Sequence, residues 1–548
     1  MNSDIKLVSE LIAYSFEKYG DQTAVTYFCD KTSLTTKNYK ELNRDVKRLA
    51  YYLEMQGLAS TPICLIGDCS YEWIVSFYAI IWMGAYPVLI ENGLSTQETL
   101  DLVKKVNSST VLMDISKTNL SLVDELNNIG ITVSGLRKTI TNKMTVTVWV
   151  EDIIIEEKRE KAYFASCNVD DTALIVFTSG TTGANKAVML SHRNLCSDLI
   201  IAENILGKNK QSSTVAILPV NHMLQITAGI MMPIYVGVPI GIGKGRRFFL
   251  NSLKQFSPSV LVLVPAVVEM IRKKIWAEAR LNGKENSLKV ATMLSGMFLK
   301  IGIDLRRTLF RQIHQTLGGN LKTVLCGGAP ISIQTVKEFR AWGIDIYGGY
   351  GITECSPIVS CNTKSKSKDG SVGLVNNKEI RQYCEVKIVD DEVCIRGDIV
   401  MKGYYNDETA TYEAFCDGYF KTGDLGYIDK DGFLFIKGRS KNLIILENGE
   451  NVSPEELEHF FSKIEGIKDL LVCTKEVGGK TILRAIVVPT EDYKNKEALQ
   501  QYYTAEFTEI SSKLPSHKRI YVVDIRTKDF IMSSSGKIKR IEENYQLC

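Results

Sequence analysis

The sequence predicts an α/β fold, in which a large N-terminal region of layered sheets and helices is followed by a small α+β C-terminal region. Helical and strand patterns alternate over about the first 300 residues. Residues 39–57, for example, have apolar side chains at helical spacing, and the short apolar run PICLIGD follows them. Such short runs are typical of buried strands in mostly parallel sheets. At 548 residues, the chain is longer than one hydrophobic core usually organises, so two or more domains are expected.

The N-terminal region begins with an expected amphipathic helix in residues 1–20, whose acidic side chains distinguish it from a signal peptide. The helix in residues 39–57 is expected to end at its glycine, and another helix is expected from about Tyr71. Further short apolar runs predict strands at residues 111–114, 173–179, 214–220 and 260–265. The apolar run at residues 77–90 is too short, and too interrupted by glycine and proline, to span a bilayer. No integral membrane segment is therefore expected.

The pattern changes after about residue 380. Residues 384–398 and 433–439 are bounded by Asp and Gly, as β-hairpin strands often are. Ser453 is a good N-cap for a helix that starts at Pro454, and residues 469–489 predict two strands joined by a Gly-Gly turn. We therefore predict two domains, residues 1–440 and 441–548.

Composition excludes several classes of partner and site. The formal net charge is only +3, and the basic cluster of Lys244, Arg246 and Arg247 is typical of solvated surface, so no nucleic-acid partner is expected. The 13 cysteines are scattered without a Cys-x-x-Cys pair, as in reduced thiols of a cytosolic protein. The five histidines are isolated, which argues against a zinc site. We therefore expect a cytoplasmic protein. The sequence does not determine its oligomeric state.

The segment TSGTTGANK, residues 178–186, has the chemistry of a phosphate-binding loop. Gly180 and Gly183 permit backbone angles that let consecutive N–H groups turn towards an anion. Hydroxyl side chains stand at Thr178, Ser179, Thr181 and Thr182. Lys186 adds a cation, and Ala184 after the second glycine excludes the Walker pattern. The alternative is a serine-rich surface turn, but the density of donors favours a polyphosphate ligand.

The longer segment FTSGTTGANKAVMLSH resembles the phosphate-loop signature of the adenylate-forming superfamily, which includes acyl- and aryl-CoA synthetases, adenylation domains of peptide synthetases and firefly luciferase. Asn185 stands where the family usually has proline, and Ala187 where it usually has glycine. Further segments resemble the family in its order. They are YGGYGITECSP (347–357), residues 419–458 and SSSGKIKR (533–540), with weaker matches in LPVNHM, VLVLVPAVVEMI and LCGGAPI.

The resemblance implies the fold of these enzymes, with a mobile C-terminal lid domain, and a reaction in two halves. A carboxylic acid reacts with ATP to give an acyl-adenylate and pyrophosphate, and a thiol then displaces AMP. It also implies Mg²⁺, held by Glu354 with Thr182, and it implies catalytic roles for Lys186, Thr353, Glu354 and Lys537. The nucleotide-binding residues that it implies are Thr178, Ser179, Gly180, Thr181, Thr182, Gly183, Lys186, Gly327, Gly328, Ala329, Tyr350, Gly351, Thr353, Asp424, Arg439 and Lys537.

Within that set, the resemblance gives each residue a task. Thr353 would hydrogen-bond the α-phosphate. Asp424 would accept the ribose hydroxyls, and Arg439 would reach the ribose and the phosphates. Tyr350 and the backbone around Gly327–Ala329 would flank the adenine. Lys537 would place its charge between the carboxylate and the α-phosphate, although residues 530–532 depart from the family pattern just before it. Lys441 matches the hinge about which the small domain rotates between the two half-reactions.

The acid and the thiol are less specified. No acidic residue occurs between Leu218 and Pro233, where amino-acid-activating members usually have an aspartate, so a non-amino acid is expected. His222, Met223 and Gly327 are the expected acyl contacts, and the segment is most similar to that of fatty acyl-CoA ligases. The acceptor is coenzyme A or the phosphopantetheine of an acyl carrier protein supplied in trans. Two alternatives are a stand-alone enzyme that loads an aryl or other non-amino acid onto a carrier protein, and a non-catalytic nucleotide-binding regulator.

Overall fold

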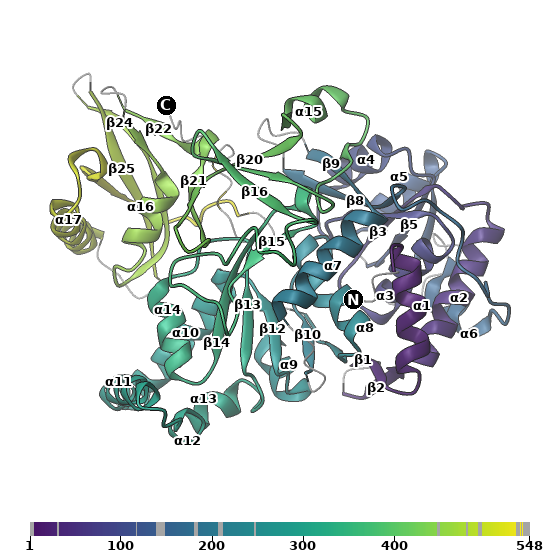
Figure 1. Cartoon of the computed structure of the whole chain (residues 1–548), viewed down its shortest axis with the longest axis horizontal. Helices are drawn as coiled ribbons and strands as arrows, with labels where there is room; N and C mark the ends of the chain where they lie inside the picture. The colour runs from purple at the N-terminus through teal and green to yellow at the C-terminus, as the bar shows by residue number, and fades with distance from the viewer. Residues whose placement is uncertain are drawn as a thin grey trace. The chain divides into compact units, whose positions relative to one another are not determined.

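The computed structural model describes residues 5–29, 32–116, 118–138, 148–179, 185–206, 212–245, 248–446, 450–477, 480–490, 496–532, 538 and 540 (Figure 1). Contacts divide the chain into two compact units. The first unit consists of Met1–Glu385 and Ile395–Phe420, and the second of Val386–Cys394 and Lys421–Cys548. The predicted division into residues 1–440 and 441–548 stays a prediction.

The largest sheet of the first unit has eight strands in the order β18-β9-β8-β4-β3-β5-β6-β7. The strands are β3 (Pro62–Ile66), β4 (Tyr86–Ile90), β5 (Thr110–Met113), β6 (Thr132–Gly135), β7 (Val148–Trp149), β8 (Thr172–Ser179), β9 (Asn185–Ser191) and β18 (Gly403–Tyr404). From β8 through β4 to β7 the pairing is parallel, as predicted, whereas β9 is antiparallel to both β8 and β18. The helices that precede or connect these strands are α1 (Val8–Tyr19), α2 (Tyr39–Met55), α3 (Tyr71–Trp82), α4 (Thr96–Lys105), α5 (Leu120–Asn128), α6 (Val150–Glu156) and α7 (His192–Leu206).

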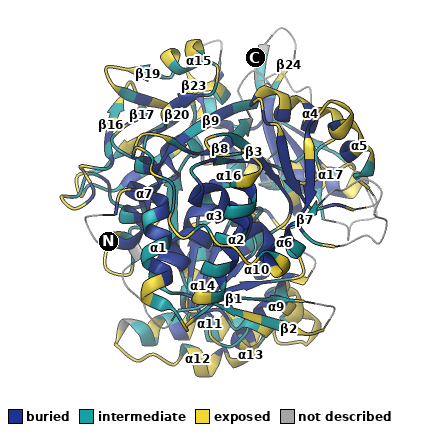
Figure 2. Cartoon of the chain, turned by 90° about the vertical axis from the view of Figure 1, so that its right-hand side faces the viewer, coloured by how far each residue is buried: buried dark blue, intermediate teal, exposed yellow. Residues whose placement is uncertain are grey.

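Local sequence sets where these helices begin. Asn38 and Glu41 form a capping box at the start of α2, in which each side chain accepts from the other residue's backbone N–H (2.8 and 2.9 Å). Ser70 caps α3 by accepting from the Trp73 N–H (3.0 Å). Every residue of α3 is buried, which explains why this helix is apolar on all sides (Figure 2).

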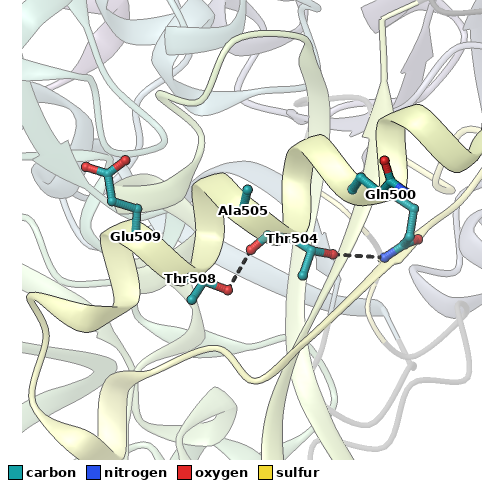
Figure 3. Close-up of a pocket in the computed structure, with 6 residues that line it drawn as sticks. Gln500, Thr504, Ala505, Thr508 and Glu509 are labelled. Carbon is teal, nitrogen blue, oxygen red and sulfur yellow. Dashed lines mark hydrogen bonds between the residues drawn. The ribbon is translucent and has the colours of Figure 1, made fainter.

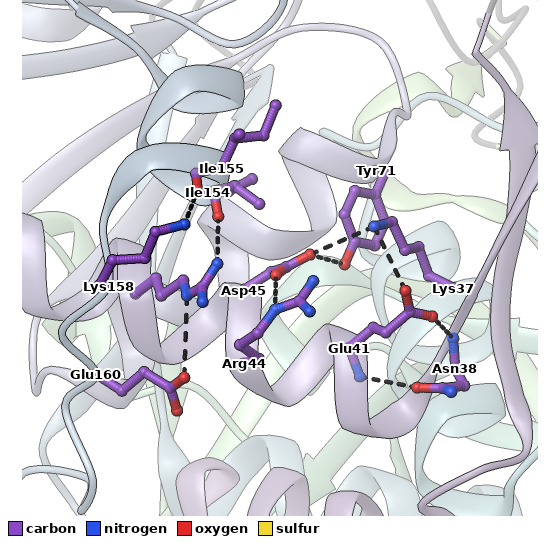
Figure 4. Close-up of polar contacts among 11 residues, drawn as sticks. Lys37, Asn38, Glu41, Arg44, Asp45, Tyr71, Ile154, Ile155, Lys158 and Glu160 are labelled. Carbon is purple, nitrogen blue, oxygen red and sulfur yellow. Dashed lines mark hydrogen bonds and ion pairs between the residues drawn. The ribbon is translucent and has the colours of Figure 1, made fainter.

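Asp45 of α2 is fully buried and hydrogen-bonds to Tyr71 of α3, which links the two helices (Figure 4). Its carboxylate accepts from the Tyr71 hydroxyl (2.7 Å) and from Arg44 Nε (2.8 Å), and Lys37 Nζ lies 3.9 Å away. Burial and the adjacent Asp45 charge raise the pKa of Tyr71 well above its usual range, so the hydroxyl remains a donor. The carboxylate is thus paired on several sides, as a buried charge must be.

Asp45→Ala is expected to destabilise the first unit by about 3 kcal/mol, because it leaves a buried hydroxyl and a cation without their partner. The measurement is the shift of the urea unfolding midpoint followed by circular dichroism. Asp21→Ala is the matched control, since Asp21 pairs with Lys40 at 2.9 Å but its side chain is 81% exposed; its loss should cost less than about 1 kcal/mol. Equal shifts for the two variants would contradict the role given to Asp45.

Two smaller sheets complete the first unit. One has the order β10-β11-β1-β2 and the other β12-β13-β14-β15. Their strands are β1 (Thr23–Phe28), β2 (Leu34–Asn38), β10 (Thr214–Ala216), β11 (Ile240–Ile242), β12 (Val260–Leu263), β13 (Thr323–Cys326), β14 (Asp345–Gly351) and β15 (Ile358–Cys361). The accompanying helices are the π-helix η1 (Gln225–Met231), α8 (Met232–Val236), α9 (Phe249–Phe256), α10 (Pro265–Leu281), α11 (Glu285–Lys300), α12 (Arg306–Leu309), α13 (Arg311–Thr316), α14 (Ile333–Ala341), the 3₁₀ helix η3 (Thr353–Cys355) and α15 (Glu408–Glu413).

The second unit has an α+β core of its own, as the sequence predicts. Strands β24 (Ile467–Val477) and β25 (Lys480–Pro489) are antiparallel, and β26 (Val522–Ile525) joins β25 in parallel. Helix α16 (Pro454–Phe461) starts after the predicted cap at Ser453, whose hydroxyl accepts from the Glu456 N–H (3.3 Å). The Phe461 ring of α16 stacks on Phe507 of α17 (Lys496–Ser512), with 4.6 Å between the ring centroids.

The remaining strands and short helices lie between residues 385 and 452 or close the second unit. They are β16 (Glu385–Val389), β17 (Glu392–Arg396), β19 (Phe415–Cys416), β20 (Tyr419–Ile428), β21 (Leu434–Arg439), η4 (Ser440–Asn442), β22 (Ile444–Ile445), β23 (Asn451–Val452) and η5 (Ser516–Lys518). Strands β16, β17 and β20 each contain residues of both units, so the division falls within these strands.

Candidate active site

The β8–β9 hairpin carries the ends of the predicted phosphate loop. Thr178 pairs with Lys186 and Ser179 with Asn185, in the antiparallel register expected for strands that enter and leave a tight loop. The predicted ligands Gly180, Thr181, Thr182 and Gly183 lie outside the described residues. The strands on either side are anchored in the core, where Val176 and Val188 are 2% and 0% exposed. The hairpin therefore fixes both ends of the loop.

Tyr404 brings two of the predicted catalytic residues together. Lys186 Nζ lies over the Tyr404 ring, 4.4 Å from its centroid, and the Tyr404 hydroxyl donates to Glu354 Oε1 (3.2 Å). Tyr404 reaches this position because β18 pairs with β9, which places it beside Val188. Burial and the Glu354 charge raise the pKa of Tyr404 well above its usual range, so it stays a neutral donor. A cation and a carboxylate far apart in sequence thus share one aromatic side chain.

The backbone around Glu354 is held as firmly as its side chain. Glu354 belongs to η3, directly after β14, and its carbonyl accepts from the Met401 N–H (2.9 Å). The Ser356 hydroxyl donates to the Ile399 carbonyl (2.8 Å). Both contacts join η3 to the segment that leads into Tyr404, so this segment positions the backbone of Glu354 as well as its side chain.

Glycines allow the strands of the predicted adenine site to approach closely. A Cβ at Gly351 would lie 1.8 Å from the Pro357 carbonyl oxygen, and one at Gly349 would lie 3.0 Å from that of Ser360. Gly327 directly follows β13, which pairs in parallel with the β14 strand that contains Tyr350, and Gly327 lies against Leu224. Gly328 has a left-handed φ of +88°, and both Gly328 and Ala329 are exposed.

The predicted acyl contacts lie where β10 leads into η1. Met223 is 2% exposed and His222 is half-buried, with its carbonyl accepting from the Gln225 N–H (2.9 Å). Next to them, Leu224 packs against a cluster without charged side chains. The cluster is formed by Leu218, Ala228, Val262 and Leu325, with Val260, Leu224, Val264, Tyr347, Ile358 and Cys361 packed against it. Because Leu224 also lies against Gly327, this apolar cluster borders the glycines of the predicted adenine site.

Asp198, which no sequence pattern indicates, holds β15 in place beside this apolar cluster. It is 0% exposed in the middle of α7, and its Oδ1 accepts from the Ile358 N–H (2.7 Å), whereas Oδ2 has no partner among the described residues. Burial raises the pKa of the Asp198 carboxyl well above its usual range. Burial thus favours the neutral form of this carboxyl, which tethers a strand of the site through the Ile358 N–H.

Asp198→Asn is expected to flatten the pH dependence of stability. A carboxyl whose pKa is raised on folding binds its proton more tightly in the folded state, so the free energy of unfolding falls as pH rises above the unfolded pKa of about 3.9. Asn keeps the acceptor for Ile358 but does not titrate. Melting temperatures at pH 5, 7 and 8.5 measure the effect, with Asp198→Ala as the control that loses the acceptor at every pH. Parallel curves for Asp198→Asn and the wild type would contradict the assignment.

In the second unit, two predicted nucleotide-binding residues, Asp424 and Arg439, form an ion pair. The two residues are paired across β20 and β21, and Arg439 Nε lies 2.9 Å from Asp424 Oδ1. The Asp424 side chain is only 7% exposed, so its position is fixed. Lys441, the predicted hinge, follows in η4 and is exposed.

The predicted catalytic Lys537 lies outside the described residues, but neighbouring residues are anchored in the second unit. Met532 and Ile538 form an antiparallel bridge and pack against the cluster that contains Leu471 and Phe530. Arg540 lies 2.5 Å from the Glu458 carboxylate of α16 and donates to the Val472 carbonyl (3.2 Å). Like Tyr404 and Asp198, Glu458 and Arg540 were not selected from the sequence.

The described residues also bear on a metal site, a membrane span and a second depression. Among the described residues, no group of three or more His, Cys, Asp and Glu side chains is arranged for a metal ion, and every helix is too short or too polar to span a bilayer. A shallow depression on α17 is lined by one face of a single helix, where Gln500 Nε2 contacts Thr504 Oγ1 at 3.4 Å (Figure 3). It contains none of the predicted site residues.

Comparisons with known proteins give the family and the fold of the chain. Residues 12–405 match the model of the AMP-binding enzyme family. The long-chain-fatty-acid–CoA ligase FadD15 of Mycobacterium bovis is 30% identical over 73% of this chain and 68% of its own. The chloroplastic long-chain-fatty-acid–[acyl-carrier-protein] ligase AEE15 of Arabidopsis thaliana is 26% identical over 91% of this chain and 78% of its own. The anthranilate CoA ligase AuaEII, solved with anthranoyl-AMP, has the same fold, with a TM-score of 0.79 and 18% identity over 98% of this chain and 96% of its own.

Proposed function

Since the chain belongs to the AMP-binding enzyme family, we propose that it is an AMP-forming acid–thiol ligase that activates a long-chain fatty acid with ATP and transfers it to coenzyme A. The observation that carries the proposal is the contact of both Lys186 and Glu354 with Tyr404. The Lys186 ammonium lies over the Tyr404 ring, and the Glu354 carboxylate accepts from the Tyr404 hydroxyl. Both charges therefore meet at one side chain near the end of the phosphate-loop hairpin. Such a pair suits a reaction between two anions, in which charge must be neutralised and the reactants positioned.

In the first half-reaction, a carboxylate oxygen of the acid attacks the α-phosphorus of ATP, and the bond from that phosphorus to pyrophosphate breaks. In the second, the thiol sulfur attacks the acyl carbon, the bond to AMP breaks and the thiol loses its proton. We assign Lys186 and the loop backbone to the phosphates, Thr353 to the α-phosphate, and Asp424 with Arg439 to the ribose. Lys537 is assigned to the charge that develops between the carboxylate and the α-phosphate.

Glu354 fits the Mg²⁺ that such a reaction uses. A single carboxylate held by a neutral hydroxyl donor agrees with the preference of Mg²⁺ for few protein ligands, with phosphate oxygens and water completing its shell. When bound, the ion neutralises phosphate charge. Thr182 is its second proposed ligand.

The apolar cluster beside Leu224 supports a fatty acid as the substrate. The cluster is made of buried and partly buried hydrophobic side chains, and an alkyl chain binds to apolar surface. His222 and Met223 are assigned to the acyl group near its carboxylate end.

A panel of acids tests the proposal by carboxylate-dependent exchange of pyrophosphate with ATP, followed by detection of AMP and of the acyl thioester. Long-chain fatty acids should support both steps with coenzyme A, while aryl and amino acids should support neither. Exchange with aryl acids alone would overturn the substrate, and no exchange with any acid would overturn the enzyme assignment in favour of a nucleotide-binding regulator.

The similarity to AEE15 over 91% of the chain favours a carrier protein as the second candidate acceptor. Coenzyme A and the phosphopantetheine arm of a carrier protein present the same thiol, so the first half-reaction does not separate them. A comparison of kcat/KM for thioester formation with coenzyme A and with a phosphopantetheinylated carrier protein does. A preference for the carrier of tenfold or more, on the order of 1.4 kcal/mol, would replace coenzyme A.

Lys441→Pro tests the proposed hinge. Proline fixes its own φ and restricts the preceding residue, so it should hinder rotation at this exposed position more than it disturbs packing. We expect retained pyrophosphate exchange and a loss of thioester formation of about tenfold or more. Lys441→Ala is the control for loss of the charge. No effect of proline on either half-reaction would remove the hinge from this residue.

A further inference from the structure

Helix α11 packs Leu288 and Ala291 against the core but also has a row of apolar side chains on the outside. Its exposed residues recur every three or four positions and form a stripe that we call the α11 stripe: Val290, Met293, Leu294 and Met297, continued by Ile301. Met293 and Met297 are 60% and 58% exposed, and Ile301 is 70% exposed. Figure 2 shows the exposed stretches of α11 and α12 at one edge of the first unit. A surface helix of a globular protein normally has the reverse pattern, with apolar residues facing the core.

The opposite face of α11 is fixed to the rest of the unit by polar contacts. The Ser295 hydroxyl donates to the Ala341 carbonyl (2.7 Å), and Trp342 Nε1 donates to Thr292 Oγ1 (3.0 Å). Ser295 is 2% exposed, so this face is covered. The helix therefore cannot roll to bury its stripe without breaking these hydrogen bonds.

The stripe continues onto the neighbouring chain segment. Ile303, Leu305 and Leu309 are between 40% and 46% exposed. A shallow recess of about 470 Å³ lies between α11 and α12, where Val290, Leu294 and Leu309 contribute to its lining. Contiguous exposed apolar surface of this kind marks an interaction site more often than scattered apolar residues do.

The charge around the stripe is strongly positive. Residues 265–314 contain ten Lys or Arg and four Asp or Glu, although the whole chain has a net charge of only +3. Three of the four acids are paired locally. Glu285 lies 3.3 Å from both Arg280 and Lys289, Asp304 lies 2.8 Å from Arg306, and Glu269 lies 3.6 Å from Arg272. Arg280 and Lys289 are 63% and 61% exposed beside the stripe. An apolar stripe flanked by Lys and Arg is the pattern of helices that lie in the interface of an anionic membrane.

We infer that the α11 stripe docks the protein on an anionic lipid bilayer, with α11 lying in the plane of the membrane surface. A second copy of the chain fits less well, because a two-fold contact would set this positive face against itself. Thioether side chains adapt to irregular apolar surroundings, which suits Met293 and Met297 to lipid contact. The inference goes beyond the ligase reaction, and the binding assays below contain no ATP, acid or thiol, so their outcome is independent of catalysis.

Sedimentation with vesicles tests the inference on the full chain. The wild type should bind phosphatidylcholine vesicles that contain phosphatidylglycerol, bind pure phosphatidylcholine weakly, and release as salt is raised. Met293→Glu with Met297→Glu should weaken binding at least ~tenfold. The matched control is Ile155→Glu with Tyr163→Glu, two exposed apolar positions (62% and 85%) elsewhere in the first unit; it should bind as the wild type does.

Peroxide footprinting is carried out on the wild type, so its result does not depend on whether a variant folds. Peroxide transfers an oxygen to exposed thioethers, so anionic vesicles should protect Met293 and Met297 from oxidation but leave Met55, 62% exposed, unprotected. Absence of vesicle binding, equal weakening in the control pair, or equal protection of Met55 would overturn the inference. So would a concentration-dependent dimer, or a complex with an acidic protein, that is lost in the stripe variant while vesicle binding is unchanged.

Discussion

Lys537→Ala is expected to lower the rate of acyl-adenylate formation by about 10²-fold or more, because it removes the charge assigned to the transition state of that step. Thioester formation from supplied acyl-adenylate should be less affected, since that step does not bring a carboxylate onto phosphorus. Pyrophosphate exchange measures the first half-reaction, and release of AMP from synthetic acyl-adenylate with coenzyme A measures the second.

Lys539→Ala is the matched control for Lys537→Ala, because it removes the same charge two residues away in the same segment. It should leave both half-reactions within about threefold of the wild type. Equal loss of both half-reactions in Lys537→Ala would contradict its role, because a general disturbance of the segment moves both. A comparable loss in Lys539→Ala would contradict it as well.

Glu354→Gln is expected to lower adenylation by about 10²–10³-fold and to raise the Mg²⁺ concentration needed for half-maximal rate. The amide keeps an oxygen for the Tyr404 hydroxyl but loses the charge that suits a hard cation. Removal of Mg²⁺ with a chelator should abolish exchange in the wild type and in the variant. The measurement is pyrophosphate exchange over a Mg²⁺ titration.

Tyr404→Phe separates the charge of Glu354 from its positioning. The variant keeps the ring beneath Lys186 and removes only the hydrogen bond to Glu354. We expect a loss of about tenfold, as for other groups that orient a metal ligand. An unchanged Mg²⁺ requirement in Glu354→Gln would contradict metal binding at this residue. A loss in Tyr404→Phe as large as that in Glu354→Gln would show that position matters more than charge.

The sequence predicted elements whose signal is local. Helix α3 begins at the expected Tyr71 because Ser70 caps it, and α16 begins after Ser453 for the same reason. The parallel strands of the large sheet are short apolar runs, which also stand out in a single sequence. The family and its activity followed from several motifs found in one order, a signal that one motif alone does not carry.

The parts that were missed depend on contacts between distant segments. Tyr404 lies on a strand of only two residues, which has no periodicity to recognise. Asp198 resembles any polar residue of a surface helix until the packing of α7 against β15 buries it. The assignment of residues 386–394 to the second unit depends on long-range contacts, which no local pattern records.

The number of residues in the π-helix η1 affects the apolar cluster that we propose as the acyl site. A π-turn holds about one residue more than an α-turn, so deletion of one residue from Gln225–Met231 can restore ordinary helical winding without breaking the helix. The α-turn completes the same rotation with one residue fewer, so side chains beyond the deletion would keep their directions while those within the turn would shift. Ala228, at the middle of η1, belongs to the apolar cluster beside Leu224. Relatives that differ by one residue in this turn would therefore have different side chains in the cluster. Selectivity for the acid can thus diverge through insertion and deletion as readily as through substitution.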